Sequence, residues 1–446
     1  MILATILVVC LGIIGVSVFL SESASQMRAF DTIDETVLAY TPHDAIWIQS
    51  NQEMIDQADD ESWSGDGSVE TPYIISGYSF NQDTQPLRIW NTDLHWIFTG
   101  NLVDSDGEDM QCGTWIDNAS NGLISGNIFR NRHSGLVFMS VENVNVTDNV
   151  IYSNTATGMD FLNTMTNCEV SGNEIYHCSI GGINIPQGAI NSTITGNHIY
   201  DCGGVGISIA GVTLNCLIQD NTVDRAGSNG MTISLATNSI VSLNTVTNAS
   251  NDGIQLYGFN MCQAKNNNIT QAGGDGLVVS YADESIISLN SIIDCSGIGI
   301  DVASSSNITI SWNCVEGNVG YAIQLSDSTE YMEVVCNTFV ENCDSCQIYD
   351  DGVDNVIQLN YYSDWNSPDN DANGIVDNPY LFDGEAENSD PYPLAVLGVI
   401  PDIEDPSATP TTPTDPDTIP MNFIVLGIGG ASMIVIIMGV LILKRR

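Results

Sequence analysis

The most specific group of chemistry-bearing residues lies near the end of the chain, in the acidic stretch 369–377. Its oxygen-bearing side chains fall at alternate positions, and Gly374 follows the third of them. Alternate spacing lets one tight loop aim several hard oxygens at one centre, as Ca²⁺ prefers. Position 12 is Tyr380 rather than an acid, so the loop departs from an EF-hand, and Asp383 is a candidate to complete it. The predicted calcium ligands are Asp369, Asp371, Asn373 and Asp377; the alternative is an acidic loop of turn-forming residues.

A second pair of carboxylates, Asp252 and Asp275, is separated by 23 residues, which is the length of one sequence repeat. If neighbouring repeats stack as strands, the two residues lie ~5 Å apart. That separation suits the two carboxylates of a retaining glycosidase or a second cation site. Both residues stand in Asn-Asp-Gly or Gly-Asp-Gly sequences, where aspartate commonly bonds the backbone of a turn. The sequence therefore leaves alternatives for Asp252 and Asp275: a catalytic pair, a cation site, or residues that bond the backbone of a turn.

A polar column recurs eleven residues after an asparagine that marks each repeat, and only Val278 interrupts it. Stacked repeats would place the column on one exposed face, where an extended ligand such as a glycan can lie. Its two acids, Asp160 and Asp301, are six repeats apart, ~29 Å at one strand spacing per repeat. This distance excludes them as a glycosidase pair. The predicted ligand-binding residues are Asp160, Asn184, Ser208, Thr232, Gln255, Asp301 and Gln324.

Histidine and cysteine give weaker signals. Copper sites need clustered His, Met or Cys, and the five histidines of the chain are scattered, so copper is not expected. Cys178 and Cys202 occupy one position on adjacent repeats, within reach of a disulfide; a stacked pair of buried thiols is the alternative. His177, Asp201 and Arg225 also stack, either as a polar ladder or as a binding patch.

The element that must position all these residues is the repeat itself. Its marker asparagines recur at intervals of 22 to 24 residues, with an apolar residue three positions before and another two positions after each of them. A fixed period of this length is typical of a solenoid, because one repeat cannot bury its apolar face alone. The marker asparagines are Asn127, Asn149, Asn173, Asn197, Asn221, Asn244, Asn267, Asn290, Asn313, Asn337 and Asn360.

Each repeat offers three short β segments and no helical period. We therefore predict an all-β fold, a right-handed parallel β-helix of about 11 to 13 coils, with the hand set by the bias of parallel crossovers. Asparagine tolerates the left-handed backbone conformation, and its amide can bond along a stack. The marker asparagines are thus expected to form a structural ladder inside a sharp turn.

The flanks predict a surface protein. The apolar start indicates a secretory signal, with an uncleaved anchor as the alternative, and the apolar stretch near the end is long enough to span a bilayer. The basic residues after that stretch place the C-terminus inside and the body outside. The predicted segments are a signal peptide (1–25), an N-terminal cap (26–85), the β-helix (86–362), a C-terminal cap (363–398), a Pro/Thr-rich stalk (399–420), a transmembrane helix (421–443) and a cytoplasmic tail (444–446).

The charge is strongly acidic, with 55 Asp and Glu against 9 Lys and Arg and a net charge of −46. Such a surface repels nucleic acid, which is excluded as a partner, and suits cations and neutral glycans. Asn-x-Ser/Thr sequences fit exposed turns of a secreted protein. The predicted glycosylation sites are Asn118, Asn145, Asn191, Asn248, Asn268 and Asn307.

Three stretches carry a resemblance to a known family: GDGSVETPYIISGY at the start, the asparagine repeats, and the closing NYYSDW, DNDANGIVDNPY and DPYPL. Over about residues 40–395 the chain resembles the NosD-like family, right-handed β-helix proteins named for a periplasmic copper-binding protein. With its stalk and anchor it is similar to archaeal cell-surface members of this pattern. The resemblance implies copper binding, but the clustered ligands for that metal are missing here.

Together these patterns predict a membrane-anchored extracellular β-helix that binds glycans or other surface proteins. One alternative is a polysaccharide-active enzyme, a glycoside hydrolase or lyase, on the same face. Another is copper delivery, as the resemblance implies. Retention of a glycan without turnover would separate the binder from the enzyme.

Overall fold

The computed structural model describes residues 40–81, 85–105, 111–343 and 346–396. The predicted signal peptide, stalk, transmembrane helix and cytoplasmic tail lie outside the described residues. Within the described residues, no helix is long and apolar enough to cross a membrane. The chain divides into two compact units, Met1–Thr41 and Pro42–Arg446, and β1 (Thr41–Pro42) lies at their boundary. The second unit holds the fold described below.

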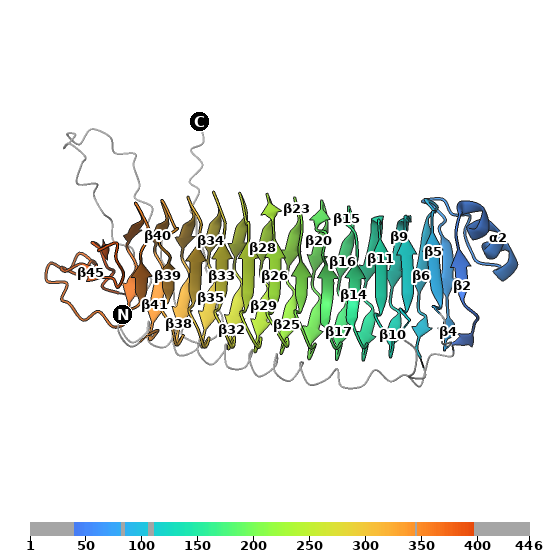
Figure 1. Cartoon of the computed structure of the whole chain (residues 1–446), viewed down its shortest axis with the longest axis horizontal. Helices are drawn as coiled ribbons and strands as arrows, with labels where there is room; N and C mark the ends of the chain where they lie inside the picture. The colour runs from blue at the N-terminus through green and yellow to red at the C-terminus, as the bar shows by residue number, and fades with distance from the viewer. Residues whose placement is uncertain (1–39, 82–84, 106–110, 344–345, 397–446) are drawn as a thin grey trace, which may run out of the picture. The chain divides into compact units, whose positions relative to one another are not determined.

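The second unit is a parallel β-helix, as predicted, in which three short strands per coil build three long parallel sheets (Figure 1). The first, sheet A, continues from one coil to the next with its strands in parallel register. Its strands are β4 (Tyr78–Phe80), β7 (Leu102–Val103), β10 (Ile128–Arg130), β13 (Val150–Tyr152), β17 (Glu174–Tyr176), β21 (His198–Tyr200), β25 (Thr222–Asp224), β29 (Thr245–Thr247), β32 (Asn268–Thr270), β35 (Ser291–Ile293), β38 (Cys314–Glu316), β41 (Thr338–Val340) and β44 (Tyr361–Tyr362).

Sheet B lies on the next side of each coil and carries the predicted ligand-binding column. Its 13 strands follow one another in chain order. They are β2 (Ile46–Ile48), β5 (Leu87–Trp90), β8 (Thr114–Asp117), β11 (Leu136–Met139), β14 (Thr157–Phe161), β18 (Gly181–Ile185), β22 (Ile207–Ile209), β26 (Met231–Ser234), β30 (Ile254–Tyr257), β33 (Leu277–Ser280), β36 (Ile300–Ala303), β39 (Ile323–Leu325) and β42 (Ile348–Asp350).

Sheet C completes each coil and ends next to the asparagine turn. Its main strands are β3 (Tyr73–Ser76), β6 (Trp96–Thr99), β9 (Ser120–Ser125), β12 (Glu142–Thr147), β16 (Glu169–Ser171), β20 (Thr193–Thr195), β24 (Leu217–Gln219), β28 (Ile240–Ser242), β31 (Gln263–Lys265), β34 (Ile286–Ser288), β37 (Thr309–Ser311), β40 (Glu333–Val335) and β43 (Val356–Gln358). Short strands lie beside them: β15 (Met165–Thr166), β19 (Ala189–Ile190), β23 (Thr213–Leu214) and β27 (Ala236–Thr237).

The period-2 pattern of each strand decides which side chains enter the core. In β22, Ile207 and Ile209 are fully buried and Ser208 between them points outward. A slip of one residue would reverse both faces, so the apolar alternation fixes the register. The register matches Ile207 with Ile183 on one neighbour and with Met231 on the other. The core is therefore a stack of apolar layers, one per coil.

The marker asparagines form a buried ladder along the whole solenoid, as predicted. The backbone N–H and Nδ2 of Asn221 both donate to Oδ1 of Asn244, at 3.1 and 3.0 Å, and Nδ2 also donates to the carbonyl of Ile194 at 2.8 Å. Oδ1 of Asn221 in turn accepts from the N–H and Nδ2 of Asn197. One expectation was wrong, because the left-handed conformation belongs to the residue before each ladder asparagine, for example Asp220 at φ 54° and Leu243 at φ 57°.

The ladder extends beyond the predicted repeat at both ends. Asn101 donates to Oδ1 of Asn127 at the start. At the other end Asp390 replaces the next asparagine: its Oδ2 accepts from the N–H of Asn360 at 2.9 Å, and its Oδ1 accepts from the N–H of Tyr392 at 2.8 Å. Both side-chain oxygens of Asp390 accept from backbone N–H groups. An asparagine here would place its NH₂ group against one of these N–H donors, so a carboxylate fits better than an amide. Burial raises the pKa of Asp390.

Both ends of the solenoid are covered. Helix α2 (Asn51–Glu61) begins after the N-cap Ser50, whose hydroxyl accepts from the N–H of Glu53, and lies at the end drawn in blue (Figure 1). The solenoid itself starts at β2, which pairs with β5, so the predicted cap 26–85 contains a first coil. At the far end, β45 (Tyr380–Leu381) and β46 (Ser389–Asp390) form an antiparallel pair within the predicted C-terminal cap.

Candidate functional site

The predicted ligand-binding residues form one continuous outward column on sheet B. Asp160 pairs in register with Asn184, Asn184 with Ser208, and Ser208 with Thr232. The register continues through Gln255, Val278, Asp301 and Gln324. Each step is one strand spacing, ~4.8 Å, and every member except Val278 carries a hydrogen-bonding group. We call this row the outer column.

The outer column is longer than the sequence indicated. Upstream it continues through Val137, Trp115, Arg88 and Trp47, and downstream it reaches Tyr349. Trp47 is 49% exposed, and the guanidinium carbon of Arg88 lies 5.1 Å from the centre of its ring. Counting from ladder asparagines missed these residues because the predicted ladder began only at Asn127. The alternation in IWI and LRIW is the signal that marks them.

Side chains of the outer column bind one another as well as facing solvent. Oδ1 of Asp160 accepts from Nδ2 of Asn184 at 2.9 Å, and its Oδ2 accepts from Ser134 at 3.0 Å and from Thr157. Nε2 of Gln324 donates to Oδ1 of Asp301 at 3.4 Å. The column is therefore held in defined rotamers before any ligand arrives.

Asp301 is the member with unusual electrostatics. Burial, and after it the neighbouring charges of Asp275 and Asp252, together raise the pKa of its carboxyl to about 6. Burial, with the charge of Asp252, also raises the pKa of Asp275. Carboxyls with raised pKa values cluster at functional sites. The part of sheet B around Asp301 is therefore a candidate site for proton transfer.

Replacing Asp301 by asparagine is expected to stabilise the protein at pH 8. The folded-state pKa of about 6 lies above the ordinary 3.8, so ionising Asp301 costs folding free energy as pH rises between these values. The gain should be about 1 kcal/mol after solvent screening is allowed for. Below about pH 3 the carboxyl is protonated in both states, because this lies under the ordinary 3.8, and the gain should vanish. Urea unfolding at the two pH values measures this, and an equal effect at both would contradict the electrostatic cause.

Asp252 and Asp275 meet on adjacent coils, and each uses one carboxylate oxygen for the backbone of the next coil. Oδ1 of Asp252 accepts from the N–H of Asp275 at 3.0 Å, and Oδ1 of Asp275 accepts from the N–H of Ile298 at 2.6 Å. Asn229 bonds Asp252 in the same way, at 3.3 Å. Of the two alternatives given by the sequence, this arrangement corresponds to aspartates that bond the backbone of a turn. Asn229, Asp252 and Asp275 form a second ladder of such bonds.

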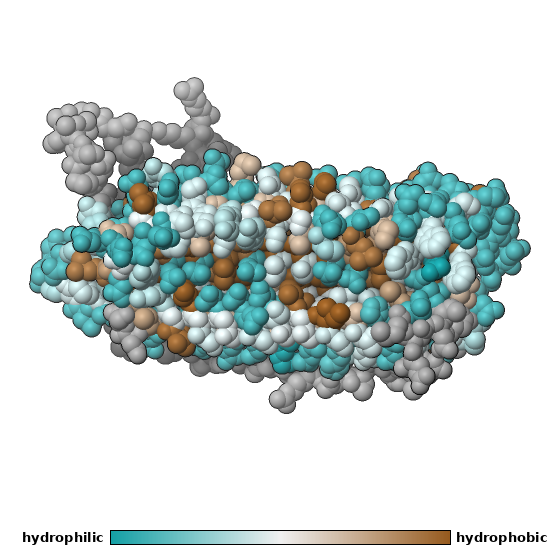
Figure 2. Space-filling model, viewed as in Figure 1, coloured by the Kyte–Doolittle hydropathy of each residue, from teal (hydrophilic) through white to brown (hydrophobic). Residues whose placement is uncertain are grey.

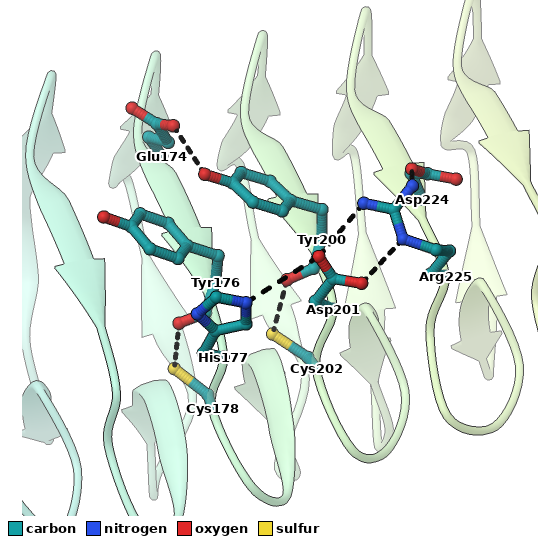
Figure 3. A network of polar contacts seen from close by, with 9 residues as sticks. All are labelled: Glu174, Tyr176, His177, Cys178, Tyr200, Asp201, Cys202, Asp224 and Arg225. Atoms are coloured by element: carbon teal, nitrogen blue, oxygen red, sulfur yellow. Dashed lines mark hydrogen bonds and ion pairs between the residues drawn. The ribbon is translucent and has the colours of Figure 1, made fainter. Parts of the chain in front are cut away.

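The stack of His177, Asp201 and Arg225 is also present (Figure 3). Asp201 bonds Arg225 at 2.6 Å and faces Nε2 of His177 at 3.8 Å, and Arg225 holds the pKa of the Asp201 carboxyl below its ordinary value. Next to it, Tyr152, Tyr176 and Tyr200 stack face to face with ring centres 4.9 and 4.8 Å apart. Stacked rings cover one another's faces, so this region is a self-paired ladder on sheet A.

The buried cysteines belong to similar inner columns. Cys178 and Cys202 are free thiols, which corresponds to the stacked-thiol alternative, and the contact with Cys202 followed by burial raises the pKa of Cys178. On another column, the N–H of Cys216 donates to Ser239 and the N–H of Ser239 donates to Sγ of Cys262. These contacts assign the cysteines a packing role.

The acidic loop brings three of the four predicted calcium ligands together. Oxygens of Asp369, Asp371 and Asp377 lie within 4.8 Å of one another. Asp369 accepts from the N–H groups of Asn373 and Gly374, at 3.1 and 2.9 Å, and Gly374 has φ 89°. The amide oxygen of Asn373 accepts from the N–H of Ile375 at 2.7 Å.

Asp383 does not complete this loop. It accepts from the hydroxyl of Tyr321 at 3.2 Å and pairs with Tyr349 near the last coil. Among the described residues, the group that could hold a metal ion consists of Asp369, Asp371 and Asp377. All three offer carboxylate oxygens.

All six predicted glycosylation sites are at least partly exposed. Four of them stand in left-handed turns, at φ between 47° and 54°. These four are Asn118, Asn191, Asn248 and Asn307. Asn145 and Asn268 lie within strands β12 and β32.

The comparisons place this architecture among known proteins. Residues 206–361 match the family model of the right-handed β-helix region, so the chain is a right-handed parallel β-helix protein. Residues 82–215 match the model of the periplasmic copper-binding protein NosD. Both matches support the predicted resemblance to NosD-like right-handed β-helix proteins. No curated protein matches the chain.

Solved structures share the fold at low identity. The A-module of the mannuronan C-5 epimerase AlgE4 from Azotobacter vinelandii has a TM-score of 0.51 and 14% identity, over 71% of this chain and 96% of that one. A DFA-IIIase from Arthrobacter chlorophenolicus A6 has a TM-score of 0.45 and 14% identity, over 72% and 96%. The catalytic unit of an α-1,3-glucanase from Streptomyces thermodiastaticus has 0.42 and 13%, over 62% and 60%.

Among the described residues, the converging group of His, Cys, Asp or Glu side chains does not suit copper. Copper prefers nitrogen and sulfur ligands, whereas the converging group here holds three carboxylates. His198 packs on the ring of Tyr200, and His177 faces Asp201. The residues present do not fit a copper ion, and no chemistry is assigned to one.

Proposed function

We propose that this protein is a membrane-anchored surface protein that binds neutral glycans along sheet B, with its body outside the cell. The observation that supports this most directly is the in-register outer column. Between Asp160 and Gln324 it offers a hydrogen-bonding group on every coil except that of Val278, at a constant ~4.8 Å step. A pyranose unit is of similar length, so successive sugars of one chain can meet successive coils.

Two further features support a carbohydrate ligand. Exposed aromatic rings stand beside the column, with Tyr257 and Tyr281 43% and 56% exposed and their ring centres 4.9 Å apart. Aromatic rings bury apolar sugar faces without needing charge. The face seen in Figure 2 shows separate hydrophobic groups among hydrophilic ones, which suits an amphipathic ligand. The net charge of −46 disfavours acidic polymers.

A polysaccharide-active enzyme is the second candidate, and the raised pKa of Asp301 favours it. A carboxyl with a pKa of about 6 next to ionised neighbours can serve as a general acid. The contacts of Asp252 and Asp275 argue against an enzyme, because each residue already uses one carboxylate oxygen to accept from a backbone N–H of the next coil. Binding without turnover is therefore the function that the geometry supports best.

The test is retention of neutral oligosaccharides by the full-length protein in detergent. Changing Thr232→Val and Gln255→Ala together removes two column groups and should weaken binding about tenfold, at ~1 kcal/mol or less per hydrogen bond. Gln219→Ala, an outward residue of β24 on sheet C, is the matched control and should bind normally. Equal affinity in all variants would contradict the proposal, and release of shortened products would favour the enzyme.

A further inference from the structure

A polar cavity lies at the corner where the first strands of sheet B end. The residue directly after β5, β8 and β11 is in the left-handed conformation in each case: Asn91 at φ 52°, Asn118 at 47° and Ser140 at 53°. Asparagine adopts that conformation at little cost. After β26, β30 and β33 the same corner holds less polar residues, whereas Ser304 follows β36 at φ 49°. The three residues after β26, β30 and β33 are Leu235, Gly258 and Tyr281.

The cavity has a volume of about 420 Å³ and a polar lining. Hydrogen bonds between lining groups fix its shape: Nδ2 of Asn118 donates to Oδ1 of Asn91 at 2.8 Å. Nδ2 of Asn51, in the first turn of α2, donates to Oδ1 of Asp93 at 2.7 Å. The lining residues used below are Asn51, Asn91, Asp93, Asn118, Ser140 and Glu142.

Several acceptors of the cavity have no donor. In the described part of the chain, no hydrogen bond reaches Oδ1 of Asn118, Oδ2 of Asp93 or Oε2 of Glu142. A ligand that supplies several hydroxyl donors complements these atoms. None of the lining residues is Lys, Arg or His, so an anionic ligand would meet two carboxylates without compensation.

An aromatic side chain, Trp90, stands next to the cavity residues in the chain. Trp90 immediately precedes Asn91 and pairs in register with Asp117 on sheet B. The guanidinium carbon of Arg88 lies 5.0 Å from the Trp90 ring and 5.1 Å from the ring of Trp47. Arg88 and Trp47 are members of the outer column, so cavity and column share the same strands.

We propose that this cavity binds the terminal unit of a neutral glycan whose following units lie along the outer column. The inference rests on the proposed function and adds a site that fixes the register of the ligand. Hydroxyl groups of the terminal unit donate to Asn118, Asp93 and Glu142. Its apolar face lies toward Trp90.

The site requires an unmodified Asn118. Nδ2 of Asn118 already donates to Asn91 inside the cavity, and a sugar attached to that nitrogen would fill the space. Mass spectrometry of the peptide that contains Asn118, from protein made by its own host, is expected to show the unmodified residue. An attached glycan at full occupancy would overturn the inference.

The binding test compares neutral oligosaccharides of two to six hexose units, with free and with chemically blocked non-reducing ends, on the full-length protein. Glu142→Gln replaces an acceptor by a donor at unchanged size, and it should lower affinity at least fivefold for the unblocked ligands only. Glu169→Gln, an exposed residue of β16 outside the cavity, is the control. Unfolding midpoints verify the fold of both variants.

The outcomes separate this inference from the proposed function. If Glu142→Gln binds normally while the Thr232 and Gln255 double variant loses affinity, the cavity is not a subsite and the proposed function stands. If blocked and unblocked ligands respond equally to Glu142→Gln, terminal recognition is also overturned. If no neutral oligosaccharide is retained at all, the proposed function fails, and the inference with it.

Discussion

Replacing Asn221 by leucine is expected to lower the free energy of unfolding by at least about 3 kcal/mol. The substitution removes the partner of the N–H and Nδ2 of Asn197 and of the carbonyl of Ile194. These groups are buried at the asparagine turn, and each unsatisfied buried group costs about 1–3 kcal/mol. Leucine has no group that can replace either the donor or the acceptor. The urea midpoint, followed by circular dichroism, measures the loss.

Asn251→Leu is the matched control, because Asn251 is exposed on the next coil and its side-chain amide bonds only Ser228, at 3.3 Å. It should change stability by less than about 0.5 kcal/mol. Stability of a solenoid is nearly a sum of repeat and interface terms, so hydrogen exchange should quicken most at the amides of Asn197 and its neighbours. A uniform change along the chain, or none, would mean that the column is not a buried ladder.

The regular part of this fold could be predicted from the sequence because one residue type marks each coil. The spacing of the ladder asparagines gives the coil length, and the apolar residues around them give the inward faces. The irregular ends could not be predicted in this way. Asn101 stands 26 residues before Asn127, outside the 22 to 24 of the repeat, and Asp390 joins the ladder from a different strand arrangement. The first coil was therefore assigned to the cap.

The candidate site was predicted in part for the same reason. Counting from ladder asparagines found the outer column from Asp160 to Gln324, but not Trp47, Arg88 and Trp115, which precede the regular repeat. The cavity near Asn91 and Asn118 depends on α2 packing beside the first coils, a tertiary contact without a sequence period. The electrostatics of Asp301 depend on Asp275 and Asp252 from two other coils. The spacing of the repeats in the sequence shows which residues are neighbours in one column. It does not show which charged residues of a different column lie close to them.

We propose that Ca²⁺ bound by the acidic loop stabilises the C-terminal end of the solenoid. Three carboxylates within 4.8 Å repel one another in a chain whose net charge is −46, and a bound divalent cation would reverse that cost. The loop is coupled to the ladder through the backbone. Gly374 and Val376 bond Ala395 and Pro393, at 3.0 and 2.8 Å, and the N–H of Leu394 donates to the carbonyl of Asn360 at 2.9 Å.

Removing calcium with a chelator is therefore expected to destabilise the cap by about 2.7 kcal/mol relative to protein at a hundred times the dissociation constant. Segment 365–385 should become accessible to protease. Asp371→Asn, which removes one charge at unchanged size, should copy both effects, whereas Asp354→Asn, an exposed aspartate outside the loop, should copy neither. Magnesium should restore little, because it demands stricter octahedral geometry. A calorimetric calcium titration without heat, together with a melting curve that the chelator leaves unmoved, would show that the loop holds its shape through its backbone hydrogen bonds alone.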